Sequence, residues 1–350
     1  MNMLKNAKLA AAALAAGAAL SAVPAAPALA QSGTVVFAGW GGSIQRAQRA
    51  VFFDSFEKET GIKVIDVPDV QLPKIQAMVE TGNTQWDVVQ ALGMWVPQGI
   101  KANLWEKLDF GVIDRKGVPP ALVDDYSIGN STYGMVLAYN TKAVGDKAPT
   151  SWASLWDTAG HPGRRGLFDG PRYTLEAALL ADGVPPDQLY PLDVDRAFKS
   201  LDRIKDDVAV WWRQWPQVPV LLASQELTMS LTSNTRITSV RKEEGAPLAM
   251  SWNQALMTVD FLAVPRNARN KENAMKLIQW MNDPERQAEL ARMTGIGPGN
   301  ADSFEFLSEQ ERADLATYHY QKGEMVLFDN AWWADNEQAM TQRWNAWKLQ

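Results

Sequence analysis

Hydrophobic and polar positions alternate between two periods along most of the chain. Apolar residues at every second position or in short runs predict strands, whereas apolar residues spaced three and four apart predict helices. Segment 34–64 shows the change clearly, since it reads strand, glycine-rich turn, helix and strand. Strands that alternate with helices are typical of α/β proteins with largely parallel sheets. We therefore expect an α/β fold.

The same reading predicts elements along the rest of the chain. Helix starts are expected at capping residues and helix ends at glycines, because these residues satisfy or terminate the unpaired backbone groups of a helix. The expected caps are Ser43, Ser151, Thr174, Asn270 and Asp283, and the expected stops are Gly82 and Gly183. Helices are predicted at 72–80, 94–105, 151–157, 174–183, 193–207, 271–281, from 284, and at 330–349; strands are predicted at 86–92, 133–144, 166–170, 227–231, 248–252 and 258–265.

The turn GWGGS raises the question of which ligand it holds. A dinucleotide fingerprint needs G-x-G-x-x-G and a phosphate loop needs G-x-x-x-x-G-K-[ST]. After Gly39 and Gly41 the third position is Ile44, and no Lys-Ser/Thr pair follows Gly42. Both nucleotide motifs are therefore excluded. A helix start at Ser43 still offers backbone N–H groups to an anionic or polar ligand group, and the alternative is a tight connection without a ligand.

The first 30 residues have the pattern of a signal peptide. Lys5 and Lys8 precede an Ala/Leu-rich run, and the small residues ALA end at Ala30, where cleavage is expected. The chain has no cysteine, so a lipid anchor, disulfides and thiolate metal ligands are excluded. No later apolar run is long enough to span a bilayer. We expect a periplasmic protein whose remaining residues, about 320, form two domains.

Charge and composition narrow the function. The net charge of −6 becomes −8 without the leader, because Lys5 and Lys8 are lost with it and no acid is. An acidic surface argues against nucleic acid and anionic membranes as partners. The chain has 15 tryptophans but two histidines, so few histidine side chains are available for a metal site or a catalytic triad. No cofactor is expected. A secreted hydrolase with a Trp-lined cleft and a carboxylate pair, such as Asp169 and Asp260, stays open as an alternative.

Several segments together resemble a known family. The chain is similar to the extracellular solute-binding proteins of bacterial ABC importers, in the group that includes the spermidine/putrescine-binding periplasmic proteins. The similarity runs in the family's order from the mature N-terminus to about Asn300 and is weaker in the Trp-rich tail. The segments are FAGWGGSI, FEKETGIKV, YGMVLAYN, TSWASLWD, GRRGLFDGPRYTLEAALLADG, APLAMSW, DFLAVPRNARNKENAMKLIQWMNDPE and GIGPGN.

This resemblance implies a two-lobed periplasmic-binding-protein fold of type II, in which each lobe is a mostly parallel sheet flanked by helices and the lobes close over a ligand. Residues 31–139 with about 262–300 would form lobe 1 and residues 140–261 lobe 2, with the C-terminal helices of 301–350 packing across both. The implied function is to capture a small solute and deliver it to an inner-membrane ABC permease, without catalysis. The protein is expected to act as a monomer.

The resemblance also implies ligand contacts. Trp40 matches an aromatic that contacts ligand in the polyamine binders, so the glycine turn with Gly41 and Ser43 is expected to face the cleft. Met94 and Trp95 lie where the family has its second first-lobe contact. Asp260 matches an acid that pairs with a ligand ammonium group. For the aromatic residues, the alternative is core packing; for Asp260, it is a protein cation.

Other positions depart from the polyamine binders. Acids that contact ligand amines there correspond to Gly170 and Tyr173 here, with Asp169 one position away. A tryptophan corresponds to the segment that holds Asn234 and Arg236. Thr258 and Ile296 stand where the polyamine binders have aromatic residues. Trp333 stands where they have a glutamine.

Lost acids and gained arginines weaken the case for a di- or tri-cation. Arg172 and Arg236 can each form a bidentate pair with a carboxylate while Asp260 holds an amine. That pattern predicts an amino acid such as γ-aminobutyrate, a related amino-carboxylate, or an aromatic acid stacked between Trp40, Tyr173 and Trp252. The alternative for each arginine is a surface ion pair.

Overall fold

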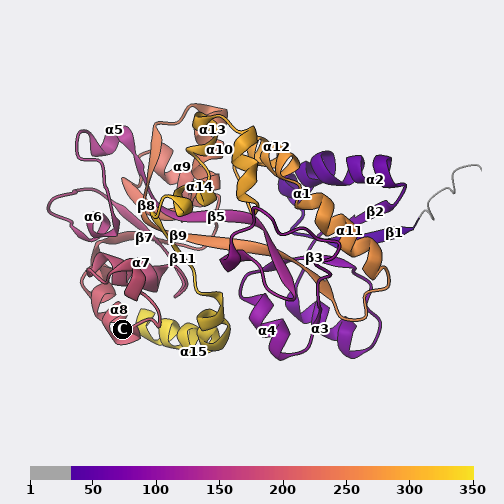
Figure 1. Ribbon diagram of the computed structural model, residues 1–350. Coiled ribbons are helices and arrows are strands. Elements are labelled where there is room, and N and C mark those ends of the chain that lie inside the picture. Colours follow the sequence, from indigo (N-terminus) through magenta and orange to yellow (C-terminus); the bar gives the residue numbers. More distant parts are fainter. Residues whose placement is uncertain (1–32) are drawn as a thin grey trace, which may run out of the picture.

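The structure, a computed structural model, describes residues 33–350. The predicted signal peptide and its cleavage site lie outside the described residues. The chain forms a mixed α/β fold in which helices cover both faces of a central sheet (Figure 1). Within the described part, no helix is both long and apolar enough to cross a membrane.

The sheet has the strand order β2-β1-β3-β9-β5-β8-β6-β7. Strands β1, β2 and β3 pair in parallel at one end, and β6, β7 and β8 pair in parallel at the other. The central strands β9 and β5 are antiparallel to each other and to their neighbours β3 and β8. The eight strands are β1 Thr34–Ala38, β2 Lys63–Val67, β3 Val88–Leu92, β5 Ser127–Asn140, β6 Arg165–Phe168, β7 Val208–Trp212, β8 Met229–Ser233 and β9 Leu248–Pro265.

The two central strands are longer than the sequence indicated. Separate strands were expected at 248–252 and 258–265, but β9 is continuous over 18 residues, with Gln254 at a φ of 62°. Strand β5 covers 14 residues and begins at Ser127, six residues before the predicted start. The predicted end at 144 is wrong, because the Asn140 side chain caps a short helix, α5 Thr141–Val144. Three short strands extend the sheet: β4 Trp105–Glu106, β10 Gly297–Pro298 and β11 Met325–Leu327.

Helices lie on both faces at each end of the sheet. Figure 1 shows α1, α2, α11 and α12 on one face beside β1 to β3, with α3 and α4 on the other; beyond the central strands, α9 and α10 lie on one face and α7, α8 and α15 on the other. The bounds are α1 Gly42–Gln48, α2 Asp54–Thr60, α3 Leu72–Glu80, α4 Trp95–Lys101, α6 Trp152–Trp156, α7 Thr174–Ala181, α8 Val194–Asp202, α9 Gln217–Ala223, α10 Asn234–Glu244, α11 Lys271–Met281, α12 Pro284–Thr294, α13 Glu309–Arg312, α14 Ala316–Gln321 and α15 Asn330–Lys348.

Helix starts test the capping predictions. Ser151, Asn270 and Asp283 occupy cap positions as predicted, and the Asp283 carboxylate accepts from the Arg286 backbone N–H. Two predictions are wrong by one or two residues. Helix α1 begins at Gly42 after Gly41, whose φ of 77° suits glycine, so Ser43 lies inside the helix. Helix α7 begins at Thr174 itself.

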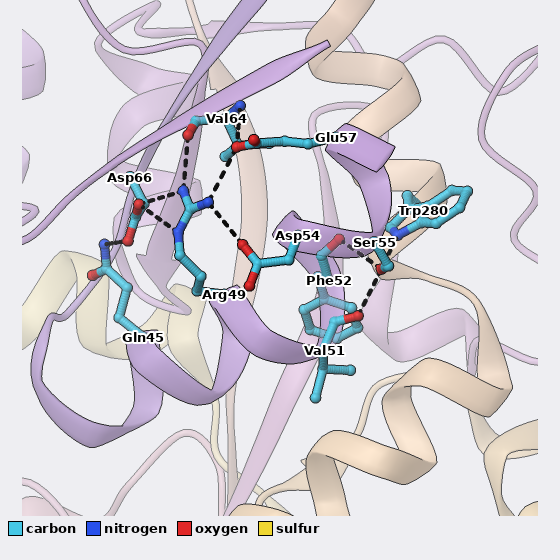
Figure 2. Close-up of polar contacts among 10 residues, drawn as sticks. All are labelled: Gln45, Arg49, Val51, Phe52, Asp54, Ser55, Glu57, Val64, Asp66 and Trp280. Atoms are coloured by element: carbon cyan, nitrogen blue, oxygen red, sulfur yellow. Dashed lines mark hydrogen bonds and ion pairs between the residues drawn. The ribbon is translucent and has the colours of Figure 1, made fainter. Parts of the chain in front are cut away.

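An ionic network anchors the helical segment after β1. Helices α1 and α2 are joined by a π-helical turn, Arg49–Phe53, and Figure 2 shows the Arg49 guanidinium between this turn and β2. Arg49 Nε donates to Asp66 Oδ1 at 2.9 Å, Nη2 to the Val64 carbonyl at 2.8 Å, and Nη1 to Glu57 at 3.1 Å. Asp66 also accepts from the Gln45 amide at 3.3 Å. The network therefore ties α1 and α2 to β2.

Helix α15 is fastened by tryptophans. Trp333, Trp344 and Trp347 are buried, and each indole N–H donates to a side-chain carboxylate. These acceptors are Glu176, Asp169 and Asp202. Three of the 15 tryptophans therefore hold the C-terminal helix in place.

Replacing Arg49 tests the network. We expect Arg49→Ala to lower the free energy of unfolding by about 2 kcal/mol, because hydrogen bonds to charged groups are worth about 1.5–3 kcal/mol and Asp66 loses its cation. Urea unfolding followed by circular dichroism measures the change. Arg115→Ala, at an exposed arginine over Phe110, is the control and should stay within about 0.5 kcal/mol of wild type. Equal stability of the two variants would contradict an anchoring role.

Candidate ligand-binding cleft

A cavity of about 710 Å³ lies where the two ends of the sheet meet the central strands. Its floor includes residues of β5 and β9, one wall comes from the β1–α1 segment, and the other comes from α10 and the start of α7. The end of α12 lies at the rim. Such a volume fits a small organic solute, since ligand pockets usually measure about 300–1,000 Å³.

Asp260 of β9 is the charged group in the floor. The residue is 5 % exposed, and its Oδ2 accepts three hydrogen bonds: from Trp40 Nε1 at 2.8 Å, from Tyr133 Oη at 3.0 Å and from Gln90 Nε2 at 3.2 Å. Among residues 33–350, Oδ1 has no hydrogen-bond donor, and it is not one of the fully buried unpaired atoms. One carboxylate oxygen is therefore held by the protein and the other is left for the cavity.

Burial changes the acid–base behaviour of this floor. Desolvation raises the pKa of Asp260 to about 6, although the donors from Trp40, Tyr133 and Gln90 favour the ionised form. Burial and the nearby Asp260 charge raise the pKa of Tyr133 well above 10, so its hydroxyl stays a donor. Asp260 has no protein cation within salt-bridge distance in the described part of the chain. A ligand cation would fill that role.

Trp40 is positioned by a second set of contacts. Its indole ring packs on Trp95 with ring centroids 5.4 Å apart, and the Gly41 backbone N–H donates to Gln45 Oε1 at 2.7 Å. Gln45 also donates to Asp66, so the turn is linked to the ionic network of Figure 2. Trp95 itself does not line the cavity and instead supports Trp40.

Aromatic rings form part of the opposite wall. Tyr173 and Trp215 both line the cavity and meet edge to face at 6.3 Å, and Phe168 stacks behind Trp215 at 5.8 Å. Tyr173 has a φ of 68°, which is unusual for a residue other than glycine and turns the chain into α7. These rings give the cavity an apolar side opposite Trp40.

Polar groups surround the outer part of the cavity. Ser43 and Arg46 come from α1, and Ser233, Thr235 and Arg236 come from the β8–α10 junction. Arg236 is exposed, and its charge lowers the pKa of Tyr133 against the larger effect of burial, so it acts on the floor of the cleft. The cavity therefore has an acid at its floor and guanidinium groups further out.

Of the predicted ligand contacts, five line the cavity: Trp40, Ser43, Tyr173, Arg236 and Asp260. The structure places the others elsewhere. Arg172 contacts the buried Met94 through Nη1–Sδ at 3.1 Å and lies 3.9 Å from Glu337. Gly41 does not line the cavity.

Three further predicted contacts have structural partners. Asn234 accepts from the Gly134 N–H and donates to the Asp314 carbonyl. Trp252 stacks on His319, with ring centroids 4.1 Å apart and an angle of 11°. Trp333 is fully buried and donates to Glu176. None of these three lines the cavity.

Tyr133, Gln90 and Arg46 were not among the predicted ligand contacts. Tyr133 and Gln90 donate to Asp260, and Arg46 lines the cavity. Tyr133 and Gln90 lie within predicted strands, where alternate residues face opposite sides, but the register that turns them toward Asp260 is tertiary. Arg46 lies one helical turn after the glycine turn, so its spacing in the sequence could have indicated that it faces the same side.

A second buried acid lies behind the aromatic wall. Glu176 Oε1 accepts from Tyr190 Oη at 2.8 Å and from Trp333 Nε1, while Oε2 is buried without a partner in the described residues. Burial raises the pKa of Glu176 to about 7. Trp333 stacks on Phe328, which packs on Tyr173. Glu176 is therefore connected through these rings to the wall of the cleft.

The fold and its cleft define a class of protein. A two-ended α/β architecture with a solute-sized cavity beside the central strands is that of a periplasmic binding protein, and residues 52–317 match the family model of bacterial extracellular solute-binding proteins. The chain belongs to this family, as the resemblance predicted. Its fold class is likewise confirmed, with the qualification that the central strands are antiparallel.

Particular relatives narrow the comparison. The chain is 33 % identical to the gamma-aminobutyric acid-binding protein of Pseudomonas aeruginosa, over 92 % of this chain and 93 % of the relative. It is 26 % identical to the spermidine/putrescine-binding periplasmic protein of Salmonella typhimurium, over 87 % and 88 %. The solved structure of the Atu4243 GABA receptor superposes with a TM-score of 0.82 at 39 % identity, covering 90 % of this chain and 97 % of that one.

The hydrolase alternative receives no support. The relatives are solute-binding proteins rather than enzymes. Asp169, the proposed second carboxylate, does not line the cavity and pairs with Arg213 at 2.8 Å, with the Trp344 indole at 3.1 Å and with Lys348 at 3.7 Å. The two carboxylates therefore do not face one bound substrate.

Glu176 gives the protein a pH-dependent stability. The pKa of Glu176 in the folded protein is about 7, above the ordinary value of 4.5. Its contribution to the free energy of unfolding is therefore fully present below pH 4.5 and is lost as the pH rises through 7. We expect Glu176→Gln to become more stable relative to wild type between pH 5 and pH 8, by up to about 3 kcal/mol. Urea unfolding at both pH values measures this change. Asp187→Asn, at an exposed acid outside the cavity, is the control. A stability difference that stays constant between pH 5 and 8 would rule out titration of Glu176.

Proposed function

We propose that this protein is a periplasmic receptor that captures a small ω-amino acid of the γ-aminobutyrate type and delivers it to an inner-membrane ABC permease. One observation carries the proposal: Asp260, with one oxygen that accepts no hydrogen bond, lies in the same cavity as Arg236, which has no side-chain partner among residues 33–350. An amine at one end of the ligand and a carboxylate at the other complement that arrangement. The gamma-aminobutyric acid-binding relative and the GABA receptor support the ligand class.

The groups of the cleft have separate roles in this proposal. Asp260 Oδ1 accepts the ligand ammonium, and the ring of Trp40 covers the methylene chain and adds a cation–π contribution. Tyr173 and Trp215 cover the other side of the chain. Arg236 binds the carboxylate from the opposite wall. An aromatic carboxylate remains the second candidate, favoured by the facing rings of Trp40 and Tyr173.

A polyamine fits this cleft less well. A diamine would place its second ammonium group near the guanidinium of Arg236, where like charges repel. The positions that correspond to the polyamine binders' acids, Gly170 and Tyr173, carry no charge. The chain is also less similar to the polyamine-binding relative than to the gamma-aminobutyric acid-binding one.

Closure of the two lobes would trap the ligand. We place the lobes at 31–139 with about 262–300 and at 140–261, with 301–350 packing across both. Strands β5 and β9 pair with β8 at one end and β3 at the other, so bending of these two strands would move one wall against the other. The mature protein would begin after Ala30, reside in the periplasm as a monomer and present its closed form to the permease.

Removing the Asp260 charge tests the amine site. We expect Asp260→Asn to weaken binding of γ-aminobutyrate by about 2 kcal/mol or more, because a buried charge pair is lost. The wild-type affinity should fall by about tenfold for each pH unit below 6, since protonation of the raised-pKa Asp260 removes the partner of the ammonium. Isothermal titration calorimetry from pH 4.5 to 8 measures both. Asp187→Asn, at an exposed acid outside the cavity, is the control. An unchanged affinity in Asp260→Asn would contradict the role of Asp260 as the partner of the ligand ammonium group.

Replacing Trp40 separates ring contact from hydrogen bonding. Trp40→Phe keeps a ring but removes the N–H that holds Asp260 Oδ2, and Trp40→Ala removes both. We expect about tenfold weaker binding for the phenylalanine variant and a larger loss for the alanine variant, because stacking and cation–π contacts add to the hydrogen bond. Trp280→Phe, which packs on Phe56 away from the cleft, is the matched control. Wild-type affinity in Trp40→Ala would assign this residue to the core.

A further inference from the structure

Two arginines of the cleft have no partner in the described chain. Arg46 of α1 and Arg236 of α10 are both exposed and line the same cavity, and neither forms an ion pair or a side-chain hydrogen bond with any residue from 33 to 350. Other arginines of the surface, such as Arg196 and Arg241, pair with carboxylates. Arg46 and Arg236 therefore line the same cavity, and neither has a side-chain partner among residues 33–350.

The two arginines stand on opposite walls. Helix α1 follows β1, which lies on one side of the central pair β9–β5, and α10 follows β8 on the other side. In Figure 1 both helices lie on the same face of the sheet, and α12 packs against α1 next to them. Bending of the central strands that narrows the cavity would therefore bring these two positive charges together.

The positive charges of Arg46 and Arg236 determine which ligand group can stabilise a closed cleft. Two guanidinium groups repel at short range, and the repulsion grows as water leaves the cleft. The acid in this outer part is Glu243, whose Oε1 already accepts from Ser239 Oγ at 2.7 Å. A ligand carboxylate can accept from both guanidinium groups at once, because each of them offers several N–H donors in a plane.

From these observations we infer that the anionic end of the ligand binds between Arg46 and Arg236 and bridges the two walls. The inference rests on the proposed function, which assigns the amine to Asp260 and a carboxylate to Arg236. It adds a specificity-determining residue, Arg46, on the wall that also carries Trp40. Amines without an acidic group would bind at Asp260 but leave the two arginines apart and the cleft open.

Matched ligands and variants test the bridge. The probes are γ-aminobutyrate, n-butylamine, which lacks the acid, and butyrate, which lacks the amine. We expect Arg46→Gln to weaken γ-aminobutyrate by about tenfold to a hundredfold and to leave n-butylamine within about twofold. Arg46→Lys should recover part of the loss, since it restores the charge without the planar pair of donors. Arg115→Gln, which removes an equal charge far from the cavity, is the control.

Small-angle X-ray scattering provides the second readout. The radius of gyration of the wild type should fall with γ-aminobutyrate and stay unchanged with n-butylamine, and Arg46→Gln should lose the response to γ-aminobutyrate at saturating ligand. Equal losses for γ-aminobutyrate and n-butylamine in Arg46→Gln, or no loss for either, would overturn the bridge while leaving the proposed function intact. Binding of butyrate but not γ-aminobutyrate, abolished in Arg46→Gln, would support the bridge and contradict the amine site. Failure of the wild type to bind either acid overturns both.

Discussion

The antiparallel pairing of β5 with β9 is the constraint on which the rest of the structure depends. These strands pair over most of their length, and each also pairs with a strand from one end of the sheet, β8 for β5 and β3 for β9. Asp260 and Tyr133 lie in this pair, so the floor of the cleft is part of the element that joins the two ends. Any bending between the ends must deform the same strands.

The desolvation of Asp260 explains how the floor is organised. A buried carboxylate is costly unless hydrogen bonds compensate it, and Oδ2 receives donors from Trp40, Gln90 and Tyr133, which come from three separate segments. Gln90 is itself held by Gln48 of α1 at 3.0 Å. The hydrogen bonds that satisfy the acid therefore also fix the positions of the residues around the ligand.

The aromatic composition serves the scaffold as much as the cleft. Trp333, Trp344 and Trp347 attach α15 through indole–carboxylate hydrogen bonds, and Trp252 stacks on His319. Trp40 and Trp215 are the tryptophans that line the cavity among the described residues. A buried indole N–H usually donates to a hydrogen-bond acceptor, and the Trp333 indole has Glu176 as its acceptor. The buried carboxylate of Glu176 therefore serves the packing of Trp333, whereas Trp212 Nε1 has no partner among the described residues.

The sequence by itself determined the element types, most helix starts and the family, because periodicity, capping residues and segment order act locally. The resemblance that the sequence carries also led us to expect Asp260 and Trp40 as ligand contacts, and both line the cavity. Only the tertiary structure decided the rest. Strand register turned Tyr133 toward Asp260, and packing removed Trp333 from the cleft while leaving Arg46 in it, because these outcomes depend on contacts between segments far apart in sequence.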